Sequence, residues 1–392
     1  MSRVLSIATL YPNSHLPRFG TFVARQMEAL AAREDWDVTV INPIGVPPIP
    51  MRRYKPLAAA AVPGMEGGVE VYRPRFTLIP GVGGPFNPAL IVRAVMPMAK
   101  RLHETEPFDL VDAQFFYPDG PGAAEIAKEL SLPLSIKARG ADIQHWGQKS
   151  YALAKMLAAS EQAAGLLAVS EALKCDMAEI GLSEKKITVH YTGLDRELFR
   201  PCGKAESRRA LVEEFGIVLK DNECLLATVG ALIPRKGQGF VVDALPLLPN
   251  THLVLAGTGP DRVALATRVQ ELGLEQRVHF LGSLDHGSLP TVLSAADAVV
   301  MPSSSEGLAN AWVEALACGT PLVITDAGGA KELLIDPEAG RIVTRIAEDI
   351  AAGVRDVLAA DYAPDDVART VEQFSWDANA AALASYYAKL IA

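Results

Sequence analysis

The sequence lacks the features that mark secreted, membrane-spanning and metal-binding proteins. Its four cysteines lie far apart and show no CxxC pair or other metal-ligand spacing, which disfavours a disulfide framework and a structural zinc site. No apolar run approaches the roughly 18 residues needed to span a bilayer. The apolar run near the N-terminus, VLSIATL, has about seven residues, too few for a secretory signal. These absences predict a protein of the reducing cytoplasm.

Negative charge dominates the chain but is unevenly distributed. The formal net charge is -9, which argues against nucleic acid as a partner. Residues 1–100 contain 11 Lys+Arg against 6 Asp+Glu, whereas residues 201–392 contain 15 against 25. The basic excess includes PMRRYKPL (50–57), which is either a solvated loop or a contact with anionic lipid headgroups or a lipid-phosphate acceptor. The second alternative predicts peripheral association with the inner face of a membrane.

Short β-branched runs alternate with helical segments along the whole chain. Because 392 residues exceed what one core usually supports, we expect two domains. Nearly continuous apolar strands separated by helices predict parallel sheets covered on both faces. The fold class is therefore α/β, with two doubly wound, Rossmann-like domains that face a cleft. The expected strands are residues 4–10, 37–44, 69–74, 109–115, 132–139, 165–170, 187–192, 224–232, 252–257, 277–282, 298–303, 321–326 and 341–344.

A link rich in proline, glycine and polar residues, within 199–217, predicts the domain boundary near residue 205. This gives an N-terminal domain of residues 1–204 and a C-terminal domain of residues 205–373. The last segment, 374–392, has the pattern of a helix that buries one face.

The stretch SSSEGLANAWVEALACGTPLVITDAGG (303–329) places two carboxylates eight positions apart. Glu306 follows a predicted strand, and Glu314 lies among apolar residues of the next helix, which Gly319 ends. The N–H groups that would attract an anion at the start of this helix belong to Gly307, Leu308 and Ala309. The pattern suits a ligand with a central phosphate and hydroxyls at both ends. Alternatively, Glu306 is a helix-terminus charge and Glu314 a surface residue, which fits the apolar neighbours of Glu314 poorly.

Two other strand-to-helix junctions in the C-terminal half carry candidate ligand-binding residues. VGALIPRKGQGF (229–240) places Arg235 and Lys236 where a cation reaches an anion attracted by helix N–H groups. A solvent-facing charge pair is the alternative. LAGTGPDR (255–262) supplies Gly257 but lacks the third glycine of a dinucleotide fingerprint and the Gly-Lys-Ser/Thr of a P-loop.

In the N-terminal half, two predicted strands end in polar residues. The loop in YPNSHLPRFGTFVARQ (11–26) carries His15, Arg18 and Gly20. Glycine there lets the backbone approach a ligand closely, or simply forms a tight turn. KARGADIQHW (137–146) carries Arg139, Asp142 and His145. Polar side chains at the carboxyl end of a strand favour a site over a core.

These motifs resemble those of the family 4 glycosyltransferases, which are retaining, use nucleotide sugars and adopt the GT-B fold. The matching segments occur in the family's order at residues 169–201, 229–239, 255–262, 278–307 and 306–334. The last contains the family's E-x7-E element as Glu306 and Glu314, the most specific of the matches. Residues 115–143 also resemble a bacterial polysaccharide-assembly branch of the family.

The resemblance implies a role for each candidate residue. Glu306 would hold sugar hydroxyls, Glu314 the ribose hydroxyls, and Lys236 would neutralise the diphosphate. The segment 277–284 would flank the base, and Gly20 would lie near the diphosphate. The implied donor-binding set is Gly20, Arg235, Lys236, Gly257, Gly282, Leu284, Glu306, Gly307, Leu308, Ala309 and Glu314, and the acceptor-binding set is His15, Arg18, Asp142 and His145.

The catalytic set implied by the resemblance is Glu306, Lys236 and Arg139. Arg139 stands where many members have a histidine, and Ala231 where many have an arginine that contacts the diphosphate. No DxD metal motif appears at the end of a predicted strand, and the family generally works without a metal, so no metal or other cofactor is expected. Helices such as 374–392 often cross back onto the N-terminal domain in this fold.

The expected activity is transfer of a hexose-type sugar from a UDP- or GDP-sugar to a glycan or lipid-linked acceptor, with retention, in polysaccharide or glycolipid synthesis. A nucleotide-sugar 2-epimerase would instead convert the donor without an acceptor. A non-catalytic nucleotide-sugar-binding homologue would bind the donor without transfer. A nicotinamide-dependent dehydrogenase is disfavoured because no complete G-x-G-x-x-G follows a strand.

Overall fold

The computed structural model describes residues 1–49 and 54–392. The chain forms two compact units: unit 1 comprises Met1–Gly193 and Trp376–Ala392, and unit 2 comprises Leu194–Ser375. Residues 50–53 of the basic stretch 50–57, for which a lipid contact is predicted, lie outside the described residues. Among the helices of the described ranges, none combines the length and apolar composition needed to cross a membrane.

The chain enters unit 2 earlier than the boundary expected near residue 205. Leu194–Gly203 already packs within unit 2: Phe199 is buried, Arg196 Nη1 donates to the carbonyl of Val371 at 2.9 Å, and the N–H of Cys202 donates to Ser294 at 3.4 Å. The sequence there looks like a linker because these anchors are single, irregularly spaced contacts, which leave no periodic pattern.

Unit 1 is built on a sheet with the strand order β10-β9-β8-β7-β1-β2-β5-β4. Neighbouring strands are parallel except β4, which runs antiparallel to β5. The strands are β1 (Ser2–Ile7), β2 (Trp36–Ile41), β4 (Gly64–Glu66), β5 (Val69–Tyr72), β7 (Leu110–Ala113), β8 (Leu134–Lys137), β9 (Gly165–Ala168) and β10 (Ile187–Val189). A separate parallel pair consists of β3 (Ile44–Val46) and β6 (Arg75–Thr77).

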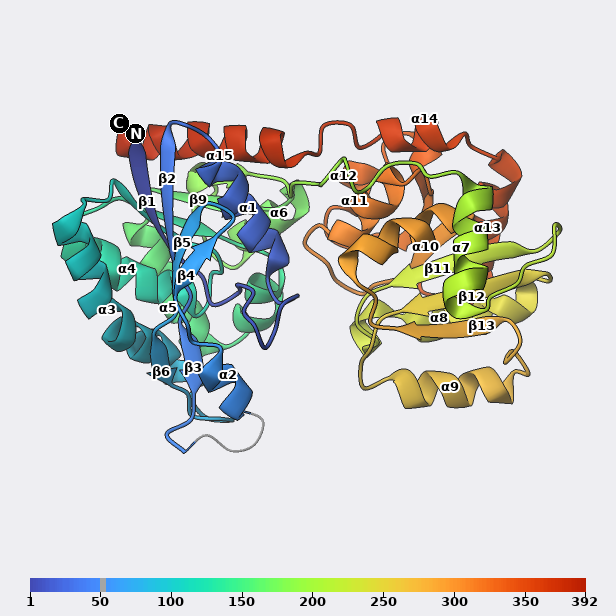
Figure 1. The fold of residues 1–392 in the computed structure, drawn as a ribbon, viewed down its shortest axis with the longest axis horizontal. Helices are drawn as coiled ribbons and strands as arrows, with labels where there is room; N and C mark the ends of the chain where they lie inside the picture. Colours follow the sequence, from blue (N-terminus) through green and yellow to red (C-terminus); the bar gives the residue numbers. More distant parts are fainter. Residues whose placement is uncertain (50–53) are drawn as a thin grey trace. The chain divides into compact units, whose positions relative to one another are not determined.

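Helices cover both faces of this sheet (Figure 1). They are α1 (Thr21–Ala31), α2 (Lys55–Ala59), α3 (Asn87–Thr105), α4 (Asp119–Leu130), α5 (Ser150–Gln162), α6 (Glu171–Glu179) and α15 (Trp376–Ile391), with short turns η2 (Gly84–Phe86), η3 (Asp142–Trp146) and η4 (Glu184–Lys186). Helices α1 and α15 share one core with β1, β2, β5 and β7, while α4 packs on β7 and β8 between α3 and α5.

Unit 2 has a fully parallel sheet in the order β13-β12-β11-β14-β15-β16. The strands are β11 (Cys224–Val229), β12 (Thr251–Ala256), β13 (Val278–Gly282), β14 (Ala298–Met301), β15 (Leu322–Thr325) and β16 (Gly340–Val343). The helices are α7 (Lys204–Phe215), α8 (Gln238–Ala244), α9 (Arg262–Glu271), α10 (Leu289–Ala295), α11 (Asn310–Ala317), α12 (Ala330–Leu333), α13 (Ala347–Ala360) and α14 (Pro364–Arg369), and the short turns are η5 (Pro234–Lys236), η6 (Leu245–Leu247), η7 (His286–Ser288) and η8 (Pro337–Ala339).

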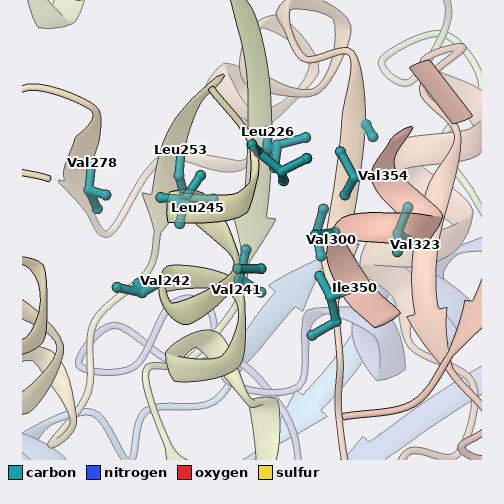
Figure 2. Packing of buried hydrophobic residues seen from close by; sticks show 14 of the residues in the cluster. Leu226, Val241, Val242, Leu245, Leu253, Val278, Val300, Val323, Ile350 and Val354 are labelled. Carbon is teal, nitrogen blue, oxygen red and sulfur yellow. The ribbon is translucent and has the colours of Figure 1, made fainter. Parts of the chain in front are cut away.

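One hydrophobic core of unit 2 lies between the sheet and the helices α8, α9 and α13. Figure 2 shows Leu226, Leu253 and Val300 of the strands facing Val241 of α8 and Ile350 of α13. Helices α10 and α11 pack on the opposite face, with α7 beside α10 and α14 beside α11. The prediction of two doubly wound parallel sheets is therefore confirmed.

The C-terminal helix α15 belongs to unit 1 and packs along α1. Leu383 and Tyr387 are fully buried in the core that also contains Met27 of α1. The Tyr387 ring lies 5.6 Å from that of Trp36, centroid to centroid. The helix thus supplies part of the core of unit 1, although the chain leaves that unit at Gly193.

We expect Leu383→Ala to lower the free energy of unfolding by about 2–5 kcal/mol, because it removes buried methyl groups and leaves a cavity. Urea unfolding followed by circular dichroism measures this loss. Lys389→Ala, at an exposed position of the same helix, is the control and should change stability by no more than about 0.5 kcal/mol. Equal losses in the two variants would mean that α15 does not contribute through its buried face.

Candidate functional site

In unit 2, the connections that follow the neighbouring strands β11 and β14 run to opposite faces of the sheet. These strands are neighbours, but β11 leads to α8 on one face and β14 leads to α11 on the other. Ligands of doubly wound sheets bind at such topological switch points. The two loops that leave the sheet there contain Arg235–Lys236 and Glu306.

The loops after β11 and β14 are joined by ion pairs. Lys236 Nζ lies 2.6 Å from Glu306 Oε1, and Arg235 Nη1 lies 3.1 Å from Glu306 Oε2. Arg235 also donates to the carbonyl of Ser305, and its own carbonyl accepts from the N–H of Ser304 at 2.8 Å. The predicted proximity of Glu306 and Lys236 is thus observed, with Arg235 as a second cation.

The electrostatics of Glu306 follow from this arrangement. Its side chain is only 8% exposed, against 15% for Lys236 and 40% for Arg235. Burial raises the pKa of the Glu306 carboxyl, but the charge and hydrogen bond of Lys236, with the charge of Arg235, outweigh burial and leave the pKa below its ordinary value. Glu306 is therefore an ionised hydrogen-bond acceptor, and both of its counter-charges come from the loop after β11.

Glu314 lies in the second turn of α11 and is buried without a comparable partner. Burial raises its pKa to about 7. The nearest basic group is the exposed ring of His286, whose Nε2 lies 4.0 Å from Oε1. The expectation of a surface carboxylate is excluded, because Glu314 is only 9% exposed.

The residues before α11 present backbone N–H groups. Within the described part of the chain, no acceptor bonds the N–H of Leu308 or Ala309, which are both 8% exposed. The helix begins at Asn310 and has no side-chain cap. Gly319 adopts a left-handed conformation just after the helix, as expected for its end. These N–H groups are thus available to an anion beside Glu306.

The turn at Gly328-Gly329 supports the loop that carries Glu306. Gly328 has φ +53°, and a Cβ there would overlap the carbonyl oxygens of Glu306 and Gly307. The N–H of Gly329 donates to the carbonyl of Gly307 at 2.8 Å. Sequence reasoning missed this role, and the only signal was the glycine pair itself.

The other predicted donor residues of unit 2 lie at the same edge of the sheet. Gly257 follows β12 and packs against the carbonyl of Gly230, so its lack of a side chain is explained by packing between loops. Gly282 ends β13 in a left-handed conformation, and Leu284 is partly buried in the following loop.

In unit 1, the predicted residues of the loop after β1 differ in exposure. Gly20 is buried, with φ +76°, because the start of α1 lies directly on the backbone of Leu10 and Tyr11. His15 and Arg18 are exposed. The close approach at Gly20 is therefore with the chain's own backbone.

The strand end at β8 brings together Arg139 and two glutamines that sequence reasoning missed. Arg139 Nε donates to the carbonyl of Gln114 at 3.3 Å, and Nη2 donates to the side-chain oxygens of Gln114 and Gln26. Asp142 is fully buried, and its carboxylate accepts from the N–H groups of Phe116, Arg139, Gly140 and Ile143. These hydrogen bonds show that Asp142 holds the turn after β8 in place. His145 is exposed, its ring edge-on to Trp146.

Two protein families match the two halves of the chain. The family described as glycosyl transferases group 1 matches residues 212–374, and the family described as glycosyltransferase family 4 matches residues 19–198. Each half of the chain thus matches a glycosyltransferase family, and the two matched segments together cover most of the chain.

Relatives of this glycosyltransferase include bacterial enzymes with different named roles. A Bacillus subtilis (strain 168) protein named as a teichuronic acid biosynthesis glycosyltransferase, TuaC, is 27% identical over 402 residues, covering 98% of each chain. A D-inositol 3-phosphate glycosyltransferase of Mycobacterium leprae (strain Br4923) is 34% identical over 223 residues, which are 53% of this chain and 50% of that one. The second match thus spans about half of each protein.

Solved structures of similar fold cover the whole glycosyltransferase. Anabaena Alr3699/HepE, solved in complex with UDP, has a TM-score of 0.75 at 20% identity and covers 99% of this chain and 100% of its own. Sucrose-phosphate synthase from Thermosynechococcus elongatus has a TM-score of 0.79 at 23% identity and covers 100% and 99%. The likeness shows the GT-B fold, as expected.

In residues 1–49 and 54–392, no three His, Cys, Asp or Glu side chains are grouped so as to hold a metal ion.

The raised pKa of Glu314 predicts a stability that falls as the pH rises. An unfolded glutamate ionises near 4.5, whereas folded Glu314 keeps its proton to about pH 7. The folded state therefore binds more protons between these values, and loses on the order of 3 kcal/mol across them. In Glu314→Gln this part of the pH slope should vanish, as measured by urea unfolding between pH 5 and 8.

Glu275→Gln is the matched control for Glu314→Gln, because Glu275 is an exposed glutamate of the same unit. It should keep the wild-type slope. An unchanged slope in Glu314→Gln would mean that Glu314 ionises at its ordinary pKa.

The packing of Gly328 predicts that Gly328→Ala destabilises the protein and displaces the Glu306 loop. Gly216→Ala is the control, because Gly216 also has positive φ, +67°, but nothing lies near its would-be Cβ. The control should cost about 1–2 kcal/mol for the left-handed backbone alone, and Gly328→Ala more. Thermal unfolding measures both, and equal losses would contradict the proposed support of the loop.

Proposed function

We propose that this glycosyltransferase moves a hexose-type sugar from a UDP- or GDP-sugar to a glycan or lipid-linked acceptor, with retained anomeric configuration and without a metal. The observation that carries the proposal is Glu306 held between Lys236 and Arg235 at the switch point of unit 2. A carboxylate, two cations and uncapped N–H groups together match a sugar joined to a diphosphate.

The diphosphate of the donor would bind Lys236, Arg235 and the N–H groups of Leu308 and Ala309. These donors would stabilise the charge that develops on the leaving diphosphate, the role that a divalent cation has in other transferases. Glu306 would accept hydrogen bonds from sugar hydroxyls, since its lowered pKa keeps it ionised.

Glu314 would hold the ribose. Two vicinal hydroxyls donate to a single carboxylate, and hydrogen bonds to the ionised form would offset the burial that raises its pKa. The loop after β13, with Gly282 and Leu284, would flank the base.

Transfer with retention would proceed on one face of the sugar. The acceptor hydroxyl oxygen would form the new bond to the anomeric carbon as the bond to the diphosphate breaks, and the hydroxyl proton would pass to the leaving diphosphate. Neither Glu306 nor Glu314 would then form a covalent intermediate.

The relatives and neighbours support the donor class and the kind of acceptor. Alr3699/HepE has been solved with UDP and with UDP-glucose, and TuaC is named for synthesis of a polymer, teichuronic acid. His15, Arg18 and His145 of unit 1 are exposed and would contact the acceptor. The basic excess of residues 1–100 would favour an anionic membrane surface, where a lipid-linked acceptor lies.

The first experiment is calorimetric titration with UDP, GDP, ADP and their common sugars, on wild type and Glu314→Ala. Selective binding of one nucleotide, weakened in Glu314→Ala, is the expected result. A protein that binds none of the UDP- and GDP-sugars at millimolar concentration contradicts the proposal. Binding without transfer to any acceptor would instead indicate a non-catalytic homologue.

With a donor in hand, we expect Lys236→Met to lower kcat by about 100–1,000-fold, because it removes a charged donor to the leaving diphosphate. Lys220→Met is the control, since Lys220 is an exposed lysine of unit 2, and it should leave the rate unchanged. Activity should persist in excess EDTA, and NMR of the product should show retained anomeric configuration. A Lys236→Met enzyme of normal rate would remove Lys236 from the mechanism.

A further inference from the structure

Arg139 is a fixed guanidinium with one end unused. Its Nε and Nη2 are held by the main-chain and side-chain oxygens of Gln114 and by Gln26, and its Cζ lies 5.1 Å from the centroid of the Phe22 ring. In the described part of the chain, no acceptor bonds Nη1, and Arg139 is partly exposed. Nη1 therefore offers two N–H donors in a set orientation.

The groups that hold Arg139 are neutral. Gln26 and Gln114 are buried amides, and Gln26 Nε2 donates to Gln114 Oε1 at 3.0 Å. The nearest acid on the network, Asp112, accepts from Gln114 rather than from the arginine. Asp142, the other buried acid, has its oxygens bonded by backbone N–H groups.

A buried lysine lies beside Arg139. Lys137 is fully buried, and its Nζ donates to the same Gln26 oxygen at 2.8 Å and to His190 Nδ1. His190 is a neutral acceptor there, because its Nε2 donates to the carbonyl of Asn379 at 2.9 Å. Burial lowers the pKa of Lys137 well below its ordinary value. Within the described ranges Arg139 forms no ion pair with a carboxylate, although the charges of Asp112 and Asp142 act on it without direct contact.

Three other arginines of low exposure are neutralised or saturated, whereas Arg345 resembles Arg139, since within the described residues it donates from Nε and Nη2 alone. Arg73 pairs with Glu66 at 2.8 Å, and Arg208 pairs with Asp297 at 2.7 Å. Arg277 has no carboxylate, but both its Nη atoms donate to backbone carbonyls. Arg139 differs from all three, since it has neither a carboxylate nor a use for Nη1.

We infer that Arg139 binds an oxyanion, a phosphate or carboxylate group of a substrate, through Nη1. The inference rests on the proposed function and deepens it, because it requires a substrate that carries an anion at unit 1. Hydrogen bonds between a guanidinium and an oxyanion are about twice as strong as those between neutral groups, and an incoming oxyanion would accept from the two unused N–H groups of Nη1. The oxyanion is either the diphosphate of the donor or an anionic group of the acceptor.

The test compares wild type with Arg139→Gln and Arg139→Lys, with Arg93→Gln as the control. Arg93 is an exposed arginine of α3 in the same unit. Each protein is first titrated with UDP, or with GDP if UDP does not bind. The nucleotide-saturated protein is then titrated with inorganic phosphate and, separately, with glucuronate. Saturation occupies the anion site of unit 2 first. Thermal unfolding without ligand shows which variants fold. If Arg139→Gln does not fold, the comparison of Arg139→Lys with wild type tests the inference.

The two sources of the oxyanion give different results. If it is the donor diphosphate, Arg139→Gln weakens nucleotide binding by about tenfold or more. If the oxyanion belongs to the acceptor, Arg139→Gln leaves nucleotide binding unchanged. The nucleotide-saturated wild type then binds phosphate or glucuronate, and Arg139→Gln weakens that binding by a similar factor. Arg139→Lys should be intermediate, because lysine keeps the charge but not the planar donor geometry. Arg93→Gln should match wild type throughout.

The inference is overturned if wild type and both Arg139 variants bind nucleotide, phosphate and glucuronate equally, or if wild type binds none of them. Failure of wild type to bind any nucleotide, with phosphate still bound, would contradict the proposed function alone. Phosphate titration of the nucleotide-free proteins would then decide the role of Arg139.

Discussion

The ion pairs of Glu306 with Lys236 and Arg235 are the constraint on which the rest of unit 2 depends. A carboxylate this buried needs counter-charges, and both come from a different loop, 70 residues away from Glu306 for Lys236. The pairing requires β11 and β14 to be neighbours with their following helices on opposite faces. It also requires the Glu306 loop to be held from behind, which the glycine turn at Gly328 does by lying on its backbone.

The two units prepare their charges in opposite ways. In unit 2 the Glu306 carboxylate is already paired with two cations before any ligand arrives. In unit 1 Arg139 is oriented by amides and has no carboxylate. Glu314 resembles Arg139 in this respect, since burial without a cation raises its pKa to about 7. A group that is already paired with an opposite charge exchanges partners when a ligand binds, whereas a group without such a pair gains a partner.

The parts of the structure that could be predicted are those with a local signature. Apolar runs separated by helical segments fixed the strands, and the rule that parallel strands end at one edge placed Lys236 near Glu306. Three-residue strands such as β4 and β6 are too short to show the alternation of apolar and polar residues by which a strand is predicted. Gln26, Gln114 and Lys137 come from a helix, a strand end and a strand that lie far apart in the sequence, so nothing in their spacing links them. The role of Gly328 depends on a contact with a loop that precedes it by some 20 residues, which no local pattern encodes.

If the proposed donor binds as the charges suggest, its diphosphate and its sugar must bind together. A diphosphate that takes Lys236 and Arg235 removes the counter-charges of Glu306 and leaves a carboxylate only 8% exposed. Burial would then raise the pKa of Glu306, because the largest of the effects that lower it come from the two cations. Hydroxyls of the attached sugar would restore acceptor contacts to the carboxylate, which a nucleoside diphosphate without a sugar cannot do. The same ion pairs that stabilise the empty site would therefore favour the intact nucleotide sugar over its product, and assist release of the nucleotide once the sugar has left.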